Sequence, residues 1–367
     1  MLEEYPLGQL AEPLLEWFSV HARVLPWRED PSPYRVWVSE IMLQQTRVEA
    51  VKPYFERFVK ELPNVSALAA CGQEQLLKLW EGLGYYNRVR NMQAAAQTMM
   101  ESYDGQLPAD YEELLKLKGI GHYTAGAVAS IAYGIPVPAV DGNVLRILMR
   151  VSADDSDIQK QSVKAKAERL LLPVIPKGHA GAFNQALMEL GALVCVPNGE
   201  PKCSECPWMP LCRAYQEKSY GRLPVKGKPK PRKIEEKTVL LIRDGQRVLL
   251  HRRPDKGLLA GMYEFPNLPG HKTRDEVTAY VKEMELTPIK IEPLEHAGHI
   301  FSHIEWHMTG YMIRVAQLED PQMPGSGFVF AQAADAEEKY AIPSAFARYT
   351  KYMNIRLGQE KYDGKNK

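Results

Sequence analysis

Two carboxylates stand in sequence surroundings that favour different protonation states. Glu40 lies in "YRVWVSEIMLQQTR" among large apolar residues, where burial would disfavour the charged form and raise its pKa. Asp141 precedes the apolar run of "PVPAVDGNVLRILMRV", where a helix N-terminus would favour the ionised form. A protonated carboxyl and an anionic one together can cleave the bond between a sugar and a heteroatom. Taken singly, the ordinary interpretations are preferred, namely a solvent-facing glutamate for Glu40 and a helix N-cap for Asp141.

Four of the five cysteines lie in one short segment, "CVPNGEPKCSECPWMPLC". They are Cys195, Cys203, Cys206 and Cys212, with the spacing C-x7-C-x2-C-x5-C. Four thiolates from one loop can hold a zinc ion or a [4Fe-4S] cluster, because sulfur binds both tetrahedrally. The spacing therefore predicts a metal site and leaves the choice between these two groups open.

A pair of glycines, Gly119 and Gly121, stands just before an apolar helical run in "LKLKGIGHYTAGAV". Such a turn can direct backbone N–H groups and a helix N-terminus toward one anion. Tyr123 falls in the first turn of the following helix. Because one helix and one connection separate Tyr123 from Asp141, we expect both to border the same cleft.

The predicted secondary structure that positions these residues changes along the chain from helices to strands. Upstream of residue 220, apolar residues recur at intervals of three and four, which predicts an all-α domain. Downstream, "KTVLLIRDGQRVLLHRRP" predicts a β-hairpin around Asp244 and Gly245, and further strands with one helix follow, which predicts an α+β domain. Between them, "RLPVKGKPKPRK" is basic and rich in proline, as in a solvated linker that could also lie along a phosphate backbone.

We therefore predict a helical domain over 1–220, a basic linker over 221–235, a second domain over 236–360 and a tail over 361–367. A composition of 45% hydrophobic and 25% charged residues is ordinary for a globular protein, and the net charge of +1 neither favours nor excludes nucleic acid. No apolar run approaches the roughly 20 residues of a membrane span, and the acidic N-terminus is not typical of a secretion signal. We expect no membrane association and a cytoplasmic location.

Several motifs together resemble one family. "LKGIGHYTAGA" is similar to a helix-hairpin-helix (about 112–133), "VPAVDGNV" to the aspartate segment after it, and residues 195–212 to an iron–sulfur loop. With "LPWR", "SEIMLQQT" and "EGLGYYNR", they resemble the adenine DNA glycosylases of the MutY type along the whole chain. The resemblance implies an all-α helix-hairpin-helix glycosylase domain with a [4Fe-4S] loop, followed by an α+β Nudix-like domain.

The resemblance also implies a base-excision repair hydrolase. Such an enzyme flips out adenine mispaired with 8-oxoguanine and hydrolyses its N-glycosidic bond; action opposite guanine stays open. Glu40 would be the acid that protonates adenine, and Asp141 the carboxylate that stabilises the sugar cation, with Tyr123 and Asn143 as supports. The related endonuclease III group carries a catalytic lysine where Tyr123 stands, so we predict a monofunctional enzyme that leaves an abasic site.

The further residues that the resemblance assigns to DNA or base contacts are Trp27, Arg28, Leu43, Gln45, Thr46, Leu83, Tyr85, Gly119, Gly121, Gln185, Phe301, Ser302 and His303. Gln45, Leu83 and Tyr85 would act as wedge and gap-filling residues, because the target base must leave the stack. Gln185 and Glu189 correspond to walls of the base pocket, and Phe301, Ser302 and His303 to the loop that reads 8-oxoguanine.

The resemblance favours [4Fe-4S] over zinc, although the first two cysteines are separated by seven residues rather than the family's usual six. A monovalent or calcium ion is a further candidate at the helix-hairpin-helix. The helix "RDEVTAYVKEM" lacks the paired glutamates that bind Mg²⁺ in active Nudix hydrolases, so the second domain is predicted to recognise rather than hydrolyse. We expect a monomer that binds double-stranded DNA containing 8-oxoguanine:adenine. The alternatives are a pyrimidine-directed glycosylase and a damage sensor that has lost catalysis.

Overall fold

The computed structural model describes residues 2–227, 231–245, 247–316 and 327–363, which form two compact units. One unit comprises Met1–Ala70 and Arg90–Pro229, and the other comprises Cys71–Val89 and Lys230–Lys367. The sequence predicts one uninterrupted helical domain over 1–220, whereas the structure groups residues 71–89 with the C-terminal unit. Residues 228–230 of the predicted linker and 364–367 of the predicted tail lie outside the described residues.

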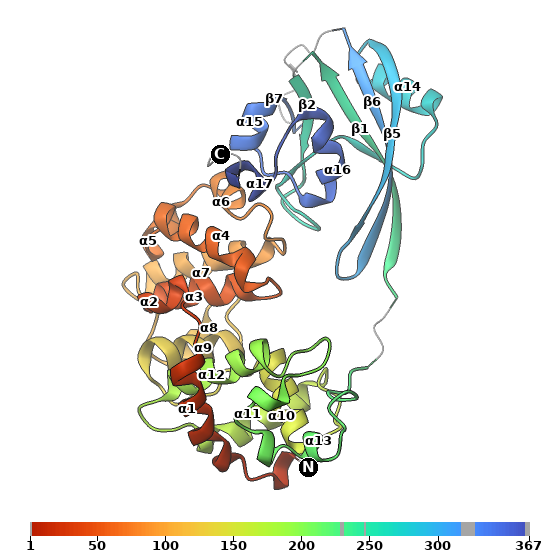
Figure 1. Ribbon diagram of the computed structural model, residues 1–367. Helices are drawn as coiled ribbons and strands as arrows, with labels where there is room; N and C mark the ends of the chain where they lie inside the picture. The colour runs from red at the N-terminus through yellow and green to blue at the C-terminus, as the bar shows by residue number, and fades with distance from the viewer. Residues whose placement is uncertain (1, 228–230, 246, 317–326, 364–367) are drawn as a thin grey trace. The chain divides into compact units, whose positions relative to one another are not determined.

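Helices build the first unit almost entirely (Figure 1). They are α1 (Ala11–His21), α2 (Pro26–Glu29), α3 (Pro33–Leu43), α4 (Val48–Glu61), α5 (Val65–Ala70), α7 (Asn87–Ser102, whose first turn belongs to the other unit), α8 (Tyr111–Lys116), α9 (His122–Tyr133), α10 (Gly142–Ser152), α11 (Gln161–Leu171), α12 (Ala180–Leu193) and α13 (Arg213–Gln216). Helix α9 packs against both α3 and α12, and α12 packs in turn against α10. These four helices therefore meet, and they carry most of the residues predicted for chemistry.

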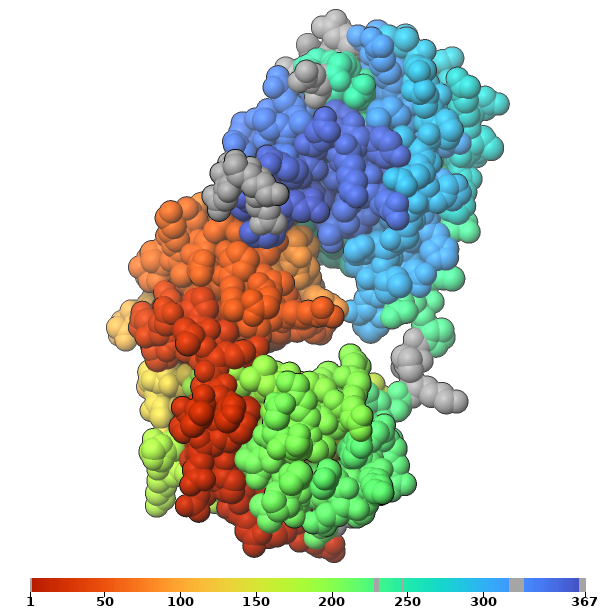
Figure 2. Space-filling view, in the orientation of Figure 1, coloured from red at the N-terminus to blue at the C-terminus, as the bar shows by residue number. Residues whose placement is uncertain are grey.

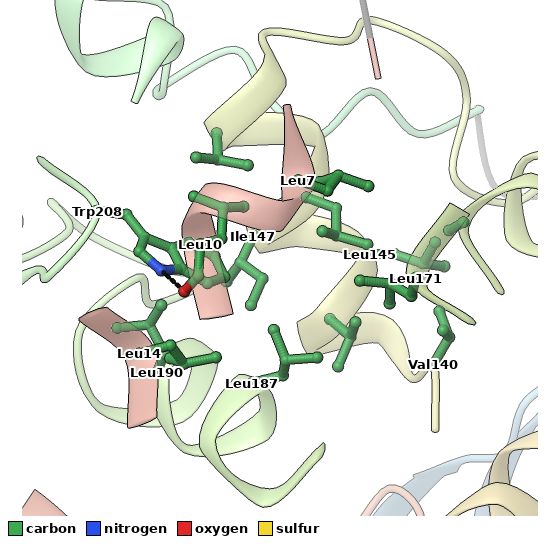
Figure 3. Packing of buried hydrophobic residues seen from close by; sticks show 14 of the residues in the cluster. Leu7, Leu10, Leu14, Val140, Leu145, Ile147, Leu171, Leu187, Leu190 and Trp208 are labelled. Atoms are coloured by element: carbon green, nitrogen blue, oxygen red, sulfur yellow. Dashed lines mark hydrogen bonds between the residues drawn. The ribbon is translucent and has the colours of Figure 1, made fainter. Parts of the chain in front are cut away.

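A core of large aliphatic side chains holds the N-terminal segment against α10 and α12. Figure 3 shows Leu7, Leu10 and Leu14 of that segment packed with Leu145, Ile147, Leu187 and Leu190. The indole N–H of Trp208 donates to the backbone carbonyl of Leu10 at 3.0 Å, so this buried donor keeps a partner. The burial of apolar area on α10 fixes the helix whose N-terminus carries Asp141.

The second unit is built on a seven-stranded sheet of order β3-β2-β1-β6-β5, with β4 paired to β1 and β7 paired to β2. Its elements are α6 (Gln73–Leu79), β1 (Lys233–Asp244), β2 (Arg247–Arg252), β3 (Tyr263–Glu264), β4 (Asn267–Pro269), α14 (Arg274–Glu283), β5 (Pro288–Ile300), β6 (Ile304–Val315), β7 (Phe328–Gln332), α15 (Ala333–Glu338), α16 (Ala347–Thr350) and α17 (Glu360–Asp363). Strands β1 and β6 are parallel and the other pairs antiparallel, so the sheet is mixed. The predicted hairpin at Asp244 and Gly245 joins β1 to β2.

Both faces of this sheet are covered. Alternate residues of β1 enter different cores, Val239 and Leu241 one of them and Leu240 and Ile242 the other, as the two-residue period of a strand requires. Helix α14 covers one face, and the segment with α15 and α16 covers the other (Figure 1). In Figure 2 the dark blue C-terminal residues form one continuous surface with the lighter blue strands. None of the helices in the described part of the chain has the length and apolar composition needed to cross a bilayer.

Candidate active site

Glu40 lies near the end of α3 and is buried, with 6% of its surface exposed. The hydroxyl of Tyr123, in the first turn of α9, donates to Oε2 of Glu40 at 2.5 Å. Burial raises the pKa of Glu40 from 4.5 to about 7; the nearby negative charge of Asp141 adds to this rise, and the bond from Tyr123 opposes it. Glu40 therefore binds a proton far more readily at neutral pH than an exposed glutamate does.

Asp141 is the N-cap of α10, as its sequence position predicts. Its Oδ1 accepts the backbone N–H of Val144 at 2.7 Å, and its Oδ2 accepts the side-chain amide of Asn143 at 2.8 Å. Burial raises the pKa of Asp141 above its usual value, and both hydrogen bonds oppose that rise. The prediction that a helix N-terminus governs this charge is thus incomplete, because burial outweighs the donors. The two bonds nevertheless give Asp141 more hydrogen-bond donors than Glu40, which has one.

Glu40, Asp141, Tyr123 and Asn143 all line one cavity of about 550 Å³. The backbone before Asp141 reaches this place because Gly126 of α9 lets it approach: a Cβ there would lie 2.1 Å from the carbonyl oxygen of Pro138. Residues predicted for the base pocket line the same cavity, namely Trp27, Arg28, Leu43, Gln185 and Glu189, and so does Thr46, which is predicted for DNA contact. The structure therefore brings the two predicted carboxylates and most of the predicted pocket residues into one space.

A buried carboxylate with two guanidinium groups forms another wall of the cavity. Glu189 accepts from Arg23 at 2.7 and 2.9 Å, and from Arg28 at 3.1 Å. Burial alone would raise the pKa of Glu189, but the bonds and charges of Arg23 and Arg28 lower it below its usual value. Arg28 also donates to Oε1 of Gln185 at 2.8 Å, which fixes how this amide faces the cavity. Glu189 therefore stays ionised where Glu40 tends to hold its proton.

A second hollow, of about 720 Å³, adjoins the first, since Tyr123, Asp141 and Asn143 line both. The predicted DNA contacts on its wall are Gln45, Thr46, Gly119 and Gly121, and the cationic side chains are Arg47 and Lys164. Gly119 has φ of 81°, and a Cβ there would lie 2.7 Å from Cβ of Asn91, so only glycine fits. Gln45 is exposed at φ 61°, a conformation that non-glycine residues seldom adopt.

Comparison with known proteins shows which family this chain belongs to. Residues 38–173 match the model of the HhH-GPD superfamily of base excision DNA repair proteins, and residues 238–352 match a NUDIX domain. An adenine DNA glycosylase of Mus musculus is 35% identical over 92% of this chain and 77% of its own length. One from Buchnera aphidicola subsp. Schizaphis graminum is 32% identical over 85% and 88%. The chain belongs to the adenine DNA glycosylase family.

It is accordingly a DNA glycosylase of base excision repair, with a helical HhH-GPD domain followed by a Nudix-like domain. A solved thermostable thymine-DNA glycosylase is similar over 57% of this chain and 96% of its own, with a TM-score of 0.51 and 27% identity. That similarity supports the fold of the helical part. The resemblance stated from the motifs is confirmed.

In this family member, Cys195, Cys203, Cys206 and Cys212 line one small cavity, and none of them is in a disulfide. Burial, with the neighbouring thiols adding to it, raises the pKa of Cys206 to about 12. Arg150 donates to Sγ of Cys195 at 3.3 Å and to the carbonyl of Val196 at 2.9 Å. In the described part of the chain no three His, Cys, Asp or Glu side chains lie close enough together to hold one metal ion. Four thiols around one cavity beside a buried cation instead suit a larger group that binds thiolates, because such a group supplies the positive charge that ionises them.

Arg146 connects this loop to the active site. Its Nε donates to the carbonyl of Cys195 at 2.9 Å, and its Nη2 donates to Oδ1 of Asn143 at 3.0 Å. Asn143 in turn donates to Asp141. The cysteine loop, through Arg146, therefore helps to orient the amide that holds Asp141.

The loop predicted to read 8-oxoguanine lies in the other unit, between β5 and β6. The backbone N–H of Phe301 donates to the carbonyl of Ile304 at 2.8 Å, which closes a tight turn with Ser302 and His303 exposed at its tip. The Phe301 ring packs edge-on against Trp306 with the ring centroids 4.8 Å apart. The same ring packs edge-on against His299 with the centroids 4.6 Å apart, and the backbone N–H of Lys233 in β1 donates to the carbonyl of His303 at 2.9 Å. The turn is thus held by backbone bonds and by two aromatic contacts.

The two remaining predicted contacts, Leu83 and Tyr85, also belong to the C-terminal unit and behave differently. Tyr85 is half exposed at φ 49°, whereas Leu83 is buried with 7% of its surface exposed. Sequence reasoning missed Arg23, Met188 and Arg146. Met188 lines the cavity with its sulfur 3.2 Å from the Tyr123 hydroxyl, and no local pattern marks any of the three.

Proposed function

We propose that this enzyme extrudes adenine paired with 8-oxoguanine from double-stranded DNA and hydrolyses its N-glycosidic bond. The observation that carries the proposal is the shared cavity in which Glu40 has a pKa of about 7 while Asp141 is held by two hydrogen-bond donors. Cleavage of a base from a sugar needs an acid for the leaving group and an anion for the sugar cation.

Glu40 gives its proton to the adenine ring, so the base departs with the electron pair of the glycosidic bond. Asp141 faces the sugar carbon that becomes positively charged, and water then supplies the hydroxyl of the abasic sugar. Tyr123 orients Glu40 through its hydroxyl, and Asn143 orients Asp141 through its amide. The walls of the base pocket are Trp27, Arg28, Leu43 and Gln185.

We propose that catalysis is monofunctional, because no amine stands at Tyr123 to attack the sugar and form an imine. A labelled duplex with adenine opposite 8-oxoguanine tests this directly. We expect strand breaks only after treatment with alkali, which cleaves at abasic sites. Strand cutting in step with base loss, without alkali, would contradict the proposal.

The DNA-binding surface is proposed to include the second hollow. The turn at Gly119 and Gly121 would bind a phosphate through backbone N–H groups, with a monovalent or calcium ion as a further ligand. Thr46 lies beside the same hollow. The exposed and conformationally unusual Gln45 and Tyr85 suit insertion into the base stack. Leu83 would take part only if DNA binding exposed its side chain.

The Nudix-like domain is proposed to identify the base opposite adenine through Phe301, Ser302 and His303. 8-Oxoguanine carries a hydrogen-bond donor at N7 that guanine lacks, and the Ser302 hydroxyl can accept from it. Ser302→Ala should reduce excision opposite 8-oxoguanine while leaving excision opposite guanine unchanged. Equal effects on both duplexes would remove Ser302 from the proposal.

The four cysteines are proposed to hold a [4Fe-4S] cluster, which would brace the loop through Cys195 and its contacts with Arg146 and Arg150. Purified protein should be brown, with about four iron atoms per chain by metal analysis. A colourless protein with one zinc per chain would favour the alternative that the cysteine spacing leaves open.

One set of duplexes separates the proposed function from its alternatives. We expect the full chain, as a monomer by light scattering, to release adenine from the A:8-oxoguanine duplex and no base from A:T or G:T controls. Release of thymine from G:T would indicate a pyrimidine-directed enzyme. Tight binding to A:8-oxoguanine without release of any base would indicate a damage sensor.

A further inference from the structure

A buried lysine bonds α6 to the Nudix-like domain. In the sequence, α6 lies within residues 38–173, which match the HhH-GPD superfamily. Lys78 is 8% exposed, and its Nζ donates to the backbone carbonyls of Ala336 at 3.0 Å and Tyr340 at 2.9 Å. Both carbonyls lie at or just after α15, so one ammonium group ties this region to α6. In Figure 1 α6 lies next to α17 of the same unit.

Glu81 makes the complementary contacts two residues after α6. It is 1% exposed, and its Oε1 accepts from Lys78 at 2.9 Å and from the backbone N–H of Ile342 at 2.8 Å. Its Oε2 accepts the backbone N–H of Gly358 at 3.2 Å, with Nζ of Lys361 at 3.7 Å. One carboxylate therefore receives donors from two separate segments of the Nudix-like domain.

The next residues form a short loop, 82–86, which is held largely by its own neighbours. The indole N–H of Trp80 donates to the carbonyl of Gly84 at 3.1 Å. Nη2 of Arg88 donates to the carbonyls of Leu83 at 3.2 Å and Gly84 at 3.1 Å. The Arg88 guanidinium also lies over the rings of Trp80 and Tyr85. These contacts fix the loop to Trp80, the residue directly before Glu81, and to Arg88.

This loop presents Tyr85, half exposed and at positive φ. We propose that Lys78 and Glu81 are positioning residues through which the Nudix-like domain sets the place of Tyr85 in the DNA stack. Binding of the base opposite adenine by the Nudix-like domain would then affect the position of Tyr85 in the DNA duplex through residues 78–85. The inference rests on the proposed specificity for 8-oxoguanine.

A buried ion pair adds little to the free energy of folding, because the cost of desolvating both charges offsets most of their attraction. Apolar side chains of similar volume would stabilise the fold as much. Hydrogen bonds to backbone groups instead fix the position of one segment relative to another, because they form only at one alignment. Glu81 accepts two backbone N–H groups at once, which an apolar side chain cannot do. This argues for a role in alignment rather than in stability.

The test compares Glu81→Gln and Lys78→Met with the wild type and with Glu337→Gln as a matched control. Glu337 forms a two-pronged ion pair with Arg356 within the Nudix-like domain, and its charge acts on Lys78 although the described contacts include no hydrogen bond between them. Glu337→Gln therefore removes a negative charge near Lys78 without removing a bond to α6. Single-turnover adenine excision is measured opposite 8-oxoguanine and opposite guanine. A second readout is the fluorescence of 2-aminopurine placed beside 8-oxoguanine in a duplex with an uncleavable adenine analogue, which reports disturbed stacking.

We expect Glu81→Gln and Lys78→Met to lower the preference for 8-oxoguanine at least about tenfold and to reduce the fluorescence change on binding. Lys78→Arg, which keeps the charge and donors, should restore part of both, and Glu337→Gln should match the wild type. If Glu81→Gln and Lys78→Met only lower the melting temperature, with preference and fluorescence unchanged, the residues are structural and the inference is wrong. If the wild type itself shows no preference, the proposed specificity fails instead.

Discussion

Replacing Glu40 by glutamine tests the central chemical assignment in two independent ways. Glutamine keeps the shape of the side chain and an oxygen that can accept from Tyr123, but it cannot deliver a proton to adenine. Loss of a general acid typically lowers a rate by about 10²- to 10⁴-fold. We therefore expect the variant to bind the A:8-oxoguanine duplex and to release adenine slower by that factor.

The same substitution should stabilise the protein above neutral pH. The pKa of Glu40 is about 7 in the folded chain, against a usual value of 4.5. At low pH both folded and unfolded forms hold the proton, so Glu40 has no effect on the pH dependence of folding. As pH rises from 4.5 through about 7, the unfolded form loses its proton first, and the wild type loses stability. At 1.36 kcal/mol per unit of pKa, this loss reaches about 3 kcal/mol.

Urea unfolding of wild type and Glu40→Gln near about pH 5 and about pH 8 measures this difference. The variant should gain about 2–3 kcal/mol on the wild type between the two conditions. Glu189→Gln is the control, because Arg23 and Arg28 lower the pKa of Glu189 below its usual value. The stability that Glu189 contributes is then almost fully present at both conditions, so this variant should differ from the wild type by nearly the same amount at about pH 5 and about pH 8. A Glu40→Gln effect that is independent of pH would refute the buried, proton-binding environment, whatever happens to the activity.

Three further outcomes follow from the same geometry. Single-turnover excision by the wild type should fall as pH rises through about 7, since Glu40 loses its proton there; a rate that is flat to about pH 9 would assign the acid elsewhere. Tyr123→Lys should place an amine beside Asp141 and give a covalent DNA adduct on borohydride reduction, which the wild type should not give. Gly119→Ala should lower the free energy of unfolding in urea by at least about 2 kcal/mol, because Gly119 has a positive φ and an added Cβ would collide with Asn91. Gly121→Ala is the control: an added Cβ there would meet no atom within 4 Å, so the loss should be less than about 1 kcal/mol.

The parts of the fold that local sequence determines were predictable. The hairpin at Asp244 and Gly245 follows from turn chemistry between two apolar runs, and Asp141 at the start of α10 follows from N-cap preference. The apolar neighbours of Glu40 indicated that it could be buried, but a solvent-facing side chain was the preferred interpretation of that segment alone, and the structure buries it with most of α3. In each case the cause lies within a few residues of the feature itself.

The missed features depend on contacts between residues far apart in the chain. Arg23 reaches Glu189 across 166 residues, and Lys78 reaches Ala336 across 258, so no window of sequence shows either pair. Residues 71–89 lie within the range that matches the HhH-GPD family, as the sequence predicts, but their buried polar bonds to the C-terminal unit are equally invisible in any short window. The charge of Asp141 was incompletely predicted because the packing around the helix end, which buries it, is tertiary.

The proposed chemistry depends on a difference in hydrogen bonding between two carboxylates in one cavity. Both carboxylates are buried, and burial raises the pKa of each. Glu40 has one hydroxyl donor, whereas Asp141 has a backbone N–H and an amide, and that amide is itself oriented by Arg146. Removing a donor from Asp141 would leave the two carboxylates with similar hydrogen bonding. The ionised form of Asp141, which is proposed to face the sugar cation, would then be less stable. Asn143→Ala should therefore slow base release while leaving binding to the duplex intact, and slowing that came only from weaker binding would show that Asn143 serves DNA contact instead.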